Sequence, residues 1–364
     1  MSIHSERLDR RAALKAGAGA LAGLLLPRGL RKSYQQEFPE AARLGRIAVG
    51  KMDLKATPSV DSATVGSVYQ DNVVPLLHSA VGWHPYRTNQ RWFETPDGYL
   101  WAGQVQPVRN EPNEPVDSLP ETSLGPGFWA EVSVPYVDLT LINPPARAPW
   151  LKNQLETNMP PRFFWSQIVW VDDIRQDENG QIYYRLNQRY GYGDLFWAAA
   201  EAFRPLTLED MEPIRSEVED KRIIVDVAQQ TMSCYEGERE VYFCQVSTGA
   251  RFNASGERVD TWGTPLGSHN IWRKAVSLPL SGGSAAFGWD LPAVGWISLF
   301  VGSGVAIHST FWHNNYGEPS SRGCVNAAPE DAHWVFRWTN PVVPYDPGDM
   351  TVGIPGGTEI RVVE

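Results

Sequence analysis

The residues most able to do chemistry lie close together near the C-terminal end of the sequence. Cys324 stands in the motif Ser-Arg-Gly-Cys-Val-Asn (residues 321–326), sixteen residues after His308. A cysteine is a useful nucleophile only as a thiolate, so it needs a base or a positive charge beside it. His308 is a candidate base, and Arg322 carries a positive charge next to the thiol. The pattern predicts nucleophilic catalysis by Cys324 with His308 as general base.

The backbone around these residues should support the same chemistry. Gly323 lets the chain turn tightly before the cysteine, so that backbone N–H groups can point at a developing oxyanion. His308 follows the apolar run 304–307, whose end can hold the imidazole rigidly. Arg322 has two open roles. A guanidinium within ~4 to 6 Å of the sulfur would lower the Cys324 pKa, whereas one that points away would bind a carboxylate of the substrate.

Two further histidines compete with His308, and each residue also has an ordinary structural interpretation. His313 lies in the aromatic and polar segment 310–317, where it is either a substrate contact or a surface residue. His333 follows Pro-Glu-Asp at 329–331, which is typical of a helix start and favours a structural role. A free cysteine alone is usually a small buried hydrophobe. The assignment of Cys324 and His308 therefore depends on the motif.

Zinc is a second use for these residue types. His308, His313, Cys324 and His333 are all possible ligands. The sequence has no C-x-x-C or H-x-x-x-H spacing, so we expect no metal and no other cofactor.

The segments that must position these residues read as short strands from Lys221 onward. Residues 221–227, 231–235 and 240–246 are separated by turns. Two motifs follow, Val-Ser-Thr-Gly at 246–249 and Thr-Pro-Leu-Gly at 264–267, before Ile-His at 307–308 and the cysteine motif. This ordered set resembles the L,D-transpeptidase catalytic domain of the YkuD type. The resemblance covers residues 221–364 and implies a β-sandwich.

The resemblance also implies a reaction, the cross-linking of peptidoglycan by acyl transfer. Cys324 would attack the carbonyl after the third residue, a diamino acid, of a donor tetrapeptide stem and release D-Ala. An amine of a second stem would then attack the thioester. His308 would act as base in both steps, oriented by the backbone carbonyl of Ser309. The family most often has Gly where Ser309 stands and His where Arg322 stands.

Substrate contacts are expected around the same motifs. The expected contacts are Arg322, Asn326, Trp312, Asn314 and Tyr316. Residues 280–289, rich in Gly and Ser and ending in aromatics, are expected to form a lid over the groove.

Two other functions fit the same sequence. With water as acceptor, the enzyme would be an L,D-carboxypeptidase that trims stem peptides through the same acyl-enzyme. Alternatively, the chain is a non-catalytic wall-binding scaffold. The presence of His308, Gly323 and Cys324 argues against the scaffold, because a retired site would be free to lose them.

The residues before the catalytic segment form two β-rich blocks. Residues 45–108 are similar to bacterial SH3-like modules, with an Asp-Gly turn at 97–98 that predicts a hairpin. Residues 127–205 contain a second hairpin signal at 178–180, and their end echoes the end of the first block. We expect a second, diverged SH3-like barrel, with the Trp and Tyr residues either in the cores or in a ligand groove.

Composition limits the fold and the partners. The 28 Pro, 32 Gly and 15 Trp among 364 residues favour an all-β chain rich in turns. A formal charge of −10 argues against nucleic-acid binding.

Residues 1–32, with paired arginines at 10–11 before an apolar run, resemble a twin-arginine export signal, the alternative being an amphipathic helix. No membrane span is expected after residue 30. We therefore expect an exported protein of the cell envelope or the extracellular space, with peptidoglycan stem peptides as partners.

The other two cysteines flank a predicted hairpin. A two-residue turn at 237–238 would pair Cys234 with residue 241 and place Cys244 opposite residue 231. Cysteines that are not directly opposed are poorly placed for a disulfide. We therefore expect two free thiols.

Overall fold

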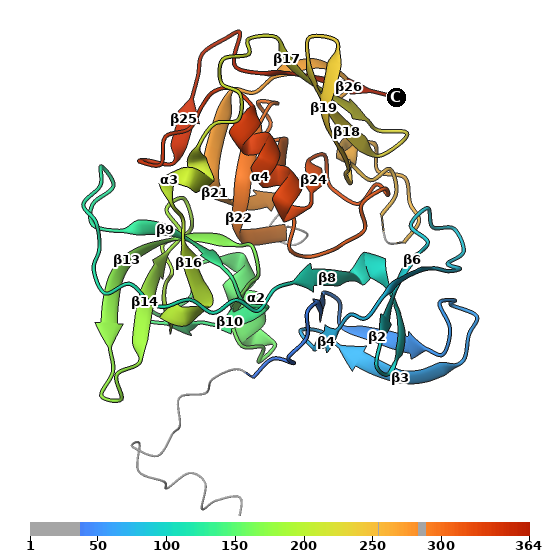
Figure 1. Ribbon diagram of the computed structural model, residues 1–364, viewed down its shortest axis with the longest axis horizontal. Coiled ribbons are helices and arrows are strands. Elements are labelled where there is room, and N and C mark those ends of the chain that lie inside the picture. The colour runs from blue at the N-terminus through green and yellow to red at the C-terminus, as the bar shows by residue number, and fades with distance from the viewer. Residues whose placement is uncertain (1–36, 254, 283–288) are drawn as a thin grey trace, which may run out of the picture. The chain divides into compact units, whose positions relative to one another are not determined.

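A computed structural model describes residues 37–253, 255–282 and 289–364 (Figure 1). The expected export signal at 1–32, and residues 283–288 of the expected lid, lie outside the described residues. Strands dominate the described chain and the helices are short, so the predicted all-β class is confirmed. No helix within these three ranges is long and apolar enough to cross a membrane.

The first group of strands forms two small sheets over residues 44–108. Their bounds are β1 (Leu44–Ile47), β2 (Lys51–Lys55), β3 (Thr64–Tyr69), β4 (Val73–Pro75), β5 (Ser79–Val81), β6 (Arg91–Thr95), β7 (Gly98–Trp101) and β8 (Val105–Val108). One sheet has the order β4-β1-β8 and the other β3-β2-β7-β6-β5. The Asp-Gly turn joins β6 to β7, which confirms that hairpin, and Gly98 takes a φ of 141° there. Trp92, Phe93 and Leu100 are central to the core.

The second group forms a longer sheet over residues 128–205. Its elements are β9 (Phe128–Val132), β10 (Tyr136–Asp138), β11 (Thr140–Leu141), α2 (Pro149–Glu156), β12 (Arg162–Phe164), β13 (Ile168–Gln176), β14 (Ile182–Asn187), β15 (Leu195–Ala199) and β16 (Phe203–Pro205). The main sheet has the order β11-β15-β14-β13-β9-β16, and β10 pairs with β12. The second predicted hairpin is confirmed, since β13 and β14 pair across its turn.

Both groups close in the same way. A strand leads into one turn of 3-10 helix, at Ala102–Gln104 in the first group and Ala200–Ala202 in the second. The next strand then pairs antiparallel with the first strand of its own group, β8 with β1 and β16 with β9. This shared ending corresponds to the similarity between the ends of the two blocks in the sequence.

The C-terminal residues form two facing sheets with a helix packed against them. After α3 (Leu208–Met211), the elements are β17 (Lys221–Asp226), β18 (Thr231–Glu236), β19 (Arg239–Gln245), β20 (Gly267–Asn270), β21 (Arg273–Gly282), β22 (Trp289–Leu299), β23 (Ala306–Ser309), β24 (Val325–Ala327), α4 (Pro329–Trp338), β25 (Asp349–Thr351) and β26 (Glu359–Val363). The sheet orders are β19-β18-β17-β26-β20 and β24-β23-β22-β21-β25. Ile223 of one sheet, Ile307 of the other and Val335 of α4 belong to one core. The predicted β-sandwich is confirmed.

The cysteine hairpin has a register that the sequence did not predict. Cys234 lies opposite Tyr242, and Cys244 opposite Met232, because an irregularity between Cys234 and Tyr235 lets β19 take up an extra residue. The predicted pairing of 234 with 241 is therefore wrong by one residue. Cys234 and Cys244 are both buried, and the structure describes both as free thiols.

Candidate active site

Two parallel strands bring the predicted nucleophile and the predicted base to the same place. β23, which ends in His308-Ser309, pairs with β24, so that His308 lies opposite Asn326. Cys324 immediately precedes β24. A pocket of about 250 Å³ opens at this point. It is lined by Leu280, Leu291, His308, Trp312, Ser320, Ser321, Arg322, Cys324 and Asn326.

The hydrogen bond of His308 determines which ring nitrogen can accept a proton. Nδ1 lies 2.9 Å from the carbonyl oxygen of Ser309. A carbonyl only accepts, so Nδ1 carries the hydrogen and the lone pair is on Nε2. Burial lowers the His308 pKa to about 4, against the smaller opposing effect of the Ser309 carbonyl. His308 is therefore neutral near pH 7, which is the state a general base requires.

Cys324 is also uncharged at rest. Its side chain is partly buried, and Sγ lies 3.9 Å from the carbonyl oxygen of Gly304. Burial raises the Cys324 pKa to about 11, although a backbone hydrogen bond with Ala306 acts in the opposite direction. The resting pair is thus a neutral thiol and a neutral imidazole. For such a pair to act as nucleophile and base, proton transfer from sulfur to nitrogen would have to accompany the attack.

The turn before Cys324 is held by the two short motifs that precede it in the sequence. The Thr264 hydroxyl donates to the Gly323 carbonyl over 2.9 Å and accepts the Gly249 N–H over 2.9 Å. Gly249 is essential to this packing, because an added Cβ would lie 1.9 Å from the carbonyl oxygen of Trp262. Sequence patterns placed Thr264 in a motif but not in this role, since its partner is 59 residues away.

The Gly323 N–H has a different use from the one expected. It donates to the Ser321 hydroxyl over 3.1 Å, and that hydroxyl donates to the Cys324 carbonyl over 2.5 Å. An N–H that already has a partner is a poor donor to an oxyanion. The role of Gly323 is conformational, because its φ is 118°, a value that L residues rarely adopt.

We expect Gly323→Ala to disturb the nucleophile even though there is space for the methyl group. The nearest atom to an added Cβ is 3.6 Å away, so the cost comes from backbone strain, about 1–3 kcal/mol. Thermal melting should show this loss, and covalent labelling of Cys324 should slow. Gly302→Ala is the matched control, because that glycine has no positive φ and no atom within 4 Å of an added Cβ. Equal behaviour of the two variants would contradict the conformational role.

The Arg322 side chain lies over an aromatic ring. It is exposed, lines the pocket and has its guanidinium carbon 5.0 Å from the centre of the Trp262 ring. The Cys324 pKa is controlled by burial and by the Ala306 backbone. Of the two roles left open by the sequence, the geometry favours recognition of a substrate carboxylate over activation of the thiol.

His313 is held in a state that excludes it as the base. The Asn315 N–H donates to its Nδ1 over 3.0 Å, and burial lowers its pKa to about 3. The neutral ring therefore carries its hydrogen on Nε2. Asn326 Nδ2 lies 2.9 Å from that Nε2, while Asn326 Oδ1 is buried without a partner. With the amide oxygen and nitrogen exchanged, Asn326 Oδ1 accepts the His313 Nε2–H, so His313 orients the Asn326 side chain.

The predicted substrate contacts divide into two sets. Arg322, Asn326 and Trp312 line the cysteine pocket, and the Trp312 ring centre lies 5.7 Å from that of His308. Asn314 and Tyr316 do not line it. Asn314 Nδ2 donates to the carbonyl of Ala102, and the Tyr316 hydroxyl donates to that of Ala327. Asn314 and Tyr316 were expected to contact the substrate, but neither faces the cysteine pocket in the structure.

The pocket also includes residues that the motifs did not reveal. Leu280, the first residue of the expected lid, comes from β21, and Leu291 comes from β22. Only the pairing of these two strands shows that Leu291 lies at the pocket, because it belongs to no recognisable motif.

His333 has the structural role that the sequence favoured. On α4, its Nε2 lies 2.7 Å from the carbonyl of Asp210, and its ring stacks on Trp296 with centres 4.0 Å apart. Across residues 37–253, 255–282 and 289–364, no three His, Cys, Asp or Glu side chains are grouped in a way that could hold a metal ion.

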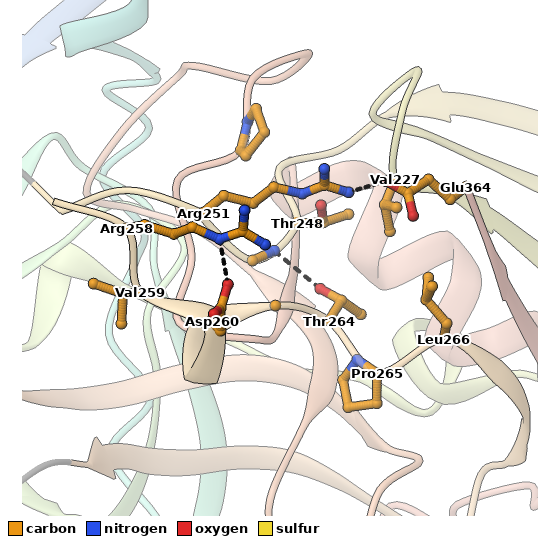
Figure 2. A pocket seen from close by; sticks show the side chains of 13 residues that line it. Val227, Thr248, Arg251, Arg258, Val259, Asp260, Thr264, Pro265, Leu266 and Glu364 are labelled. Atoms are coloured by element: carbon orange, nitrogen blue, oxygen red, sulfur yellow. Dashed lines mark hydrogen bonds and ion pairs between the residues drawn. The ribbon is translucent and has the colours of Figure 1, made fainter. Parts of the chain in front are cut away.

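A larger pocket, of about 540 Å³, does not contain the reactive residues (Figure 2). Thr248, Gly249 and Thr264 contribute to it, so it adjoins the motifs that support the Gly323 turn. Figure 2 shows its two arginines directed toward acids, Arg251 toward Glu364 and Arg258 toward Asp260. These charges are already paired, and the smaller cysteine pocket remains the candidate active site.

A β-sandwich that holds a cysteine thiol and a buried histidine with its lone pair on Nε2 in one pocket has the groups that a cysteine enzyme with a histidine base requires. Within that class, residues 220–361 match the protein-family model of the L,D-transpeptidase catalytic domain, called YkuD. These residues are therefore a YkuD-type catalytic domain. A comparison of the sequence with curated proteins finds no match.

Several solved structures are similar over part of the chain. A cysteine-to-serine variant of the Enterococcus faecium L,D-transpeptidase is 22% identical over 40% of this chain and 50% of its own, with a TM-score of 0.30. The catalytic domain of the E. faecium enzyme is 24% identical over 40% of this chain and 97% of its own, with a TM-score of 0.29. L,D-transpeptidase 3 of Mycobacterium tuberculosis, bound to a faropenem-derived adduct, is 15% identical over 63% and 92%, with a TM-score of 0.30. The chain thus spans half the length of the first of these proteins.

Proposed function

We propose that this chain is a peptidoglycan L,D-transpeptidase that works through a Cys324 thioester. The supporting observation is the placement of Cys324 and His308 on one pocket, with the His308 lone pair on Nε2, inside a domain that matches the L,D-transpeptidase family. The neutral state of both groups suits a base that removes the thiol proton during attack.

In the proposed first half-reaction, Cys324 Sγ attacks the carbonyl carbon after the third residue of a donor stem. His308 Nε2 takes the thiol proton and then gives it to the departing amine, so that the C–N bond breaks and D-Ala leaves. In the second half, an amine of another stem attacks the thioester. His308 removes its proton, the C–S bond breaks and the proton returns to sulfur. The Ser309 carbonyl stabilises the imidazolium formed in each half.

The acceptor is tested by product analysis. The protein is incubated with a tetrapeptide stem, with and without an acceptor amine, and the products are identified by mass spectrometry. Cross-linked dimers that appear only with the amine support transpeptidation. Release of D-Ala without dimers in both reactions would replace it with the L,D-carboxypeptidase, whereas no release in either would favour the wall-binding scaffold.

Arg322→Gln tests recognition of a substrate carboxylate. The Arg322 guanidinium lies over Trp262, so its removal should leave the pH profile of Cys324 alkylation unchanged. The KM for the donor stem should rise about 10-fold, the worth of one hydrogen bond to a charged group. Arg322→Lys keeps the charge but loses the planar fork, so its KM should lie between those of wild type and Arg322→Gln. An upward shift of the alkylation profile in Arg322→Gln would instead mean that Arg322 activates the thiol.

The remaining parts of the chain fit a cell-envelope enzyme. We infer that residues 45–108 and 127–205 are SH3-like modules, supported by their shared closing arrangement of strand, 3-10 turn and strand. Residues 1–32 are proposed to direct export, on the evidence of the paired arginines and apolar run. Export would place the catalytic domain where its proposed substrate lies.

A further inference from the structure

The segment that follows the proposed base is held from outside the catalytic domain. We call residues 310–318 the post-histidine loop. It carries Trp312, which lines the cysteine pocket, and His313, which orients Asn326. Several of its polar groups bond to residues 44–108, here called the first module.

Arg46 makes the most buried of these contacts. Its side chain is 3% exposed, and its Nη2 donates over 2.6 Å to the backbone carbonyl of Phe311. The same guanidinium bonds Asp71 over 2.9 Å and Gln106 over 2.8 and 3.0 Å. Burial lowers the Arg46 pKa to about 10, so the charge persists at neutral pH. A buried guanidinium is tolerated only with a near-complete set of acceptors. One of the acceptors here is the Phe311 carbonyl of the post-histidine loop.

Aromatic packing reinforces this contact. The Arg46 guanidinium carbon lies 4.0 Å from the centre of the Phe164 ring, which stacks on Phe311 with centres 5.7 Å apart. Phe311 in turn packs edge-on against Trp312, with centres 5.1 Å apart. A continuous set of contacts therefore leads from Arg46 to a wall of the cysteine pocket.

The far end of the loop has its own contacts with the first module. Glu318, 6% exposed, accepts from the Asn89 N–H over 3.0 Å and from Arg87 Nη1 over 3.1 Å. Between the two ends, the Asn314 N–H donates to the Gly103 carbonyl over 3.0 Å. The loop is thus bonded to the first module at its beginning, middle and end.

We propose that the first module is a positioning element of the active site, with Arg46 as its central positioning residue. It holds the post-histidine loop so that Trp312 and His313 shape the pocket around Cys324. This role adds to any binding of the cell wall by the module. Its effect on acylation rests on the proposed function, but its effect on the loop does not.

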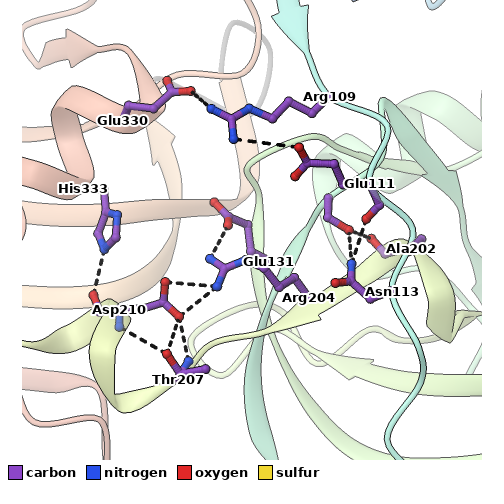
Figure 3. A network of polar contacts seen from close by, with 11 residues as sticks. Arg109, Glu111, Asn113, Glu131, Ala202, Arg204, Thr207, Asp210, Glu330 and His333 are labelled. Carbon is purple, nitrogen blue, oxygen red and sulfur yellow. Dashed lines mark hydrogen bonds and ion pairs between the residues drawn. The ribbon is translucent and has the colours of Figure 1, made fainter. Parts of the chain in front are cut away.

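A second polar network provides a matched control (Figure 3). Arg204 bonds Glu131 and Asp210, and Arg109 lies 3.5 Å from Glu330 at the start of α4. The Arg109–Glu330 pair is exposed on both sides and involves no residue of the post-histidine loop. Arg109→Ala therefore removes an arginine–carboxylate contact with the catalytic domain without touching the loop.

The experiment compares Arg46→Lys, Glu318→Ala and Arg109→Ala in the full chain. Lysine keeps a charge beside Asp71 but cannot donate to three acceptors in a fixed plane. Amide hydrogen exchange is measured at Asn314, whose N–H bonds the first module, and at Ser247, whose N–H bonds Asn326 within the catalytic domain. We expect exchange at Asn314 to quicken about 10-fold or more in the first two variants and to stay constant at Ser247.

Two reactions of Cys324 separate positioning from unfolding. If the proposed function holds, a carbapenem should acylate Cys324. Because this acylation needs a shaped pocket, it should slow about 10-fold in Arg46→Lys and Glu318→Ala. Alkylation by iodoacetamide should change less than about 2-fold, because a small reagent does not use Trp312. Unfolding would instead expose Cys234 and Cys244 and increase total alkylation. Arg109→Ala should match wild type in each measurement.

The proposal is overturned if exchange at Asn314 is unchanged in both Arg46→Lys and Glu318→Ala. It is also overturned if the loop loosens and acylation proceeds at the wild-type rate. If Arg46→Lys folds poorly, the result for Glu318→Ala decides whether the first module holds the loop. This variant should fold, because the partner Arg87 is 46% exposed and can be hydrated when the carboxylate is lost. Wild-type protein that no carbapenem acylates would count against the proposed function, and hydrogen exchange would still decide whether the module holds the loop.

Discussion

Cys324→Ala should abolish the covalent adduct that the wild-type protein is expected to form with a carbapenem. Cys324 lines an open pocket beside His308. The other two thiols are buried, and burial raises the pKa of both Cys234 and Cys244 well above the ordinary value. Intact-mass spectrometry should show one adduct on wild type and none on the variant. The variant should melt within a few degrees of wild type, because only one partly buried sulfur is lost.

The matched control is a chain in which Cys234 and Cys244 are both changed to alanine. It should keep the single adduct, and peptide mapping should place that adduct on Cys324. An adduct that survives in Cys324→Ala, or that maps to either buried cysteine, would remove Cys324 from its proposed role. Since both hairpin cysteines contribute to the core, melting of the double variant shows whether the fold is retained.

The sequence could predict that Cys324 and His308 lie together because its signals are local. The cysteine motif and the strand before His308 are short segments in a fixed order, and β23 and β24 are those segments paired side by side. The hairpins at 97–98 and 178–180 were predictable for the same reason, since turn residues act on their immediate neighbours.

Features that depend on distant partners could not be predicted from the sequence. Asn314 has the residue type of a substrate contact, but its side-chain amide donates to the carbonyl of Ala102, more than two hundred positions earlier. From the sequence, a backbone N–H at Gly323 could have been an oxyanion donor, but in the structure it donates to the Ser321 hydroxyl. The register at Cys234 differs by one residue from the predicted one, because a bulge depends on packing across the hairpin. In each case a tertiary contact decided between options that local chemistry left open.

His308→Ala should reduce the rate of acylation by ~10² to 10⁴, the usual contribution of a general base. Nδ1 is held by the Ser309 carbonyl, so Nε2 is the nitrogen that must accept the thiol proton. His313→Ala is the control. That ring is also buried, but its Nδ1 already accepts the Asn315 N–H, and its loss should act only through the orientation of Asn326. A larger loss in His313→Ala than in His308→Ala would mean that the base was assigned to the wrong histidine.

The pH dependence separates a base from a residue that merely supports the structure. The His308 pKa is lowered to about 4, so the neutral imidazole predominates above that pH. Wild-type acylation should therefore be level from about pH 5 to 9 and decline as pH falls through about 4. Folding should weaken as pH falls below the ordinary histidine pKa of about 6.5, because the unfolded chain takes up protons that His308 and His313 resist when buried. Circular dichroism at each pH identifies the range in which the protein stays folded.

Without the base, only the thiolate fraction of Cys324 reacts. Burial raises the Cys324 pKa to about 11, so that fraction grows about 10-fold per pH unit across the neutral range. The residual acylation of His308→Ala should follow this slope, and the deficit relative to wild type should shrink steadily as pH rises toward 11. A variant whose rate is as level as that of wild type would show that His308 does not remove the proton. A wild-type profile that rises with the thiolate fraction would likewise mean that no base assists the thiol.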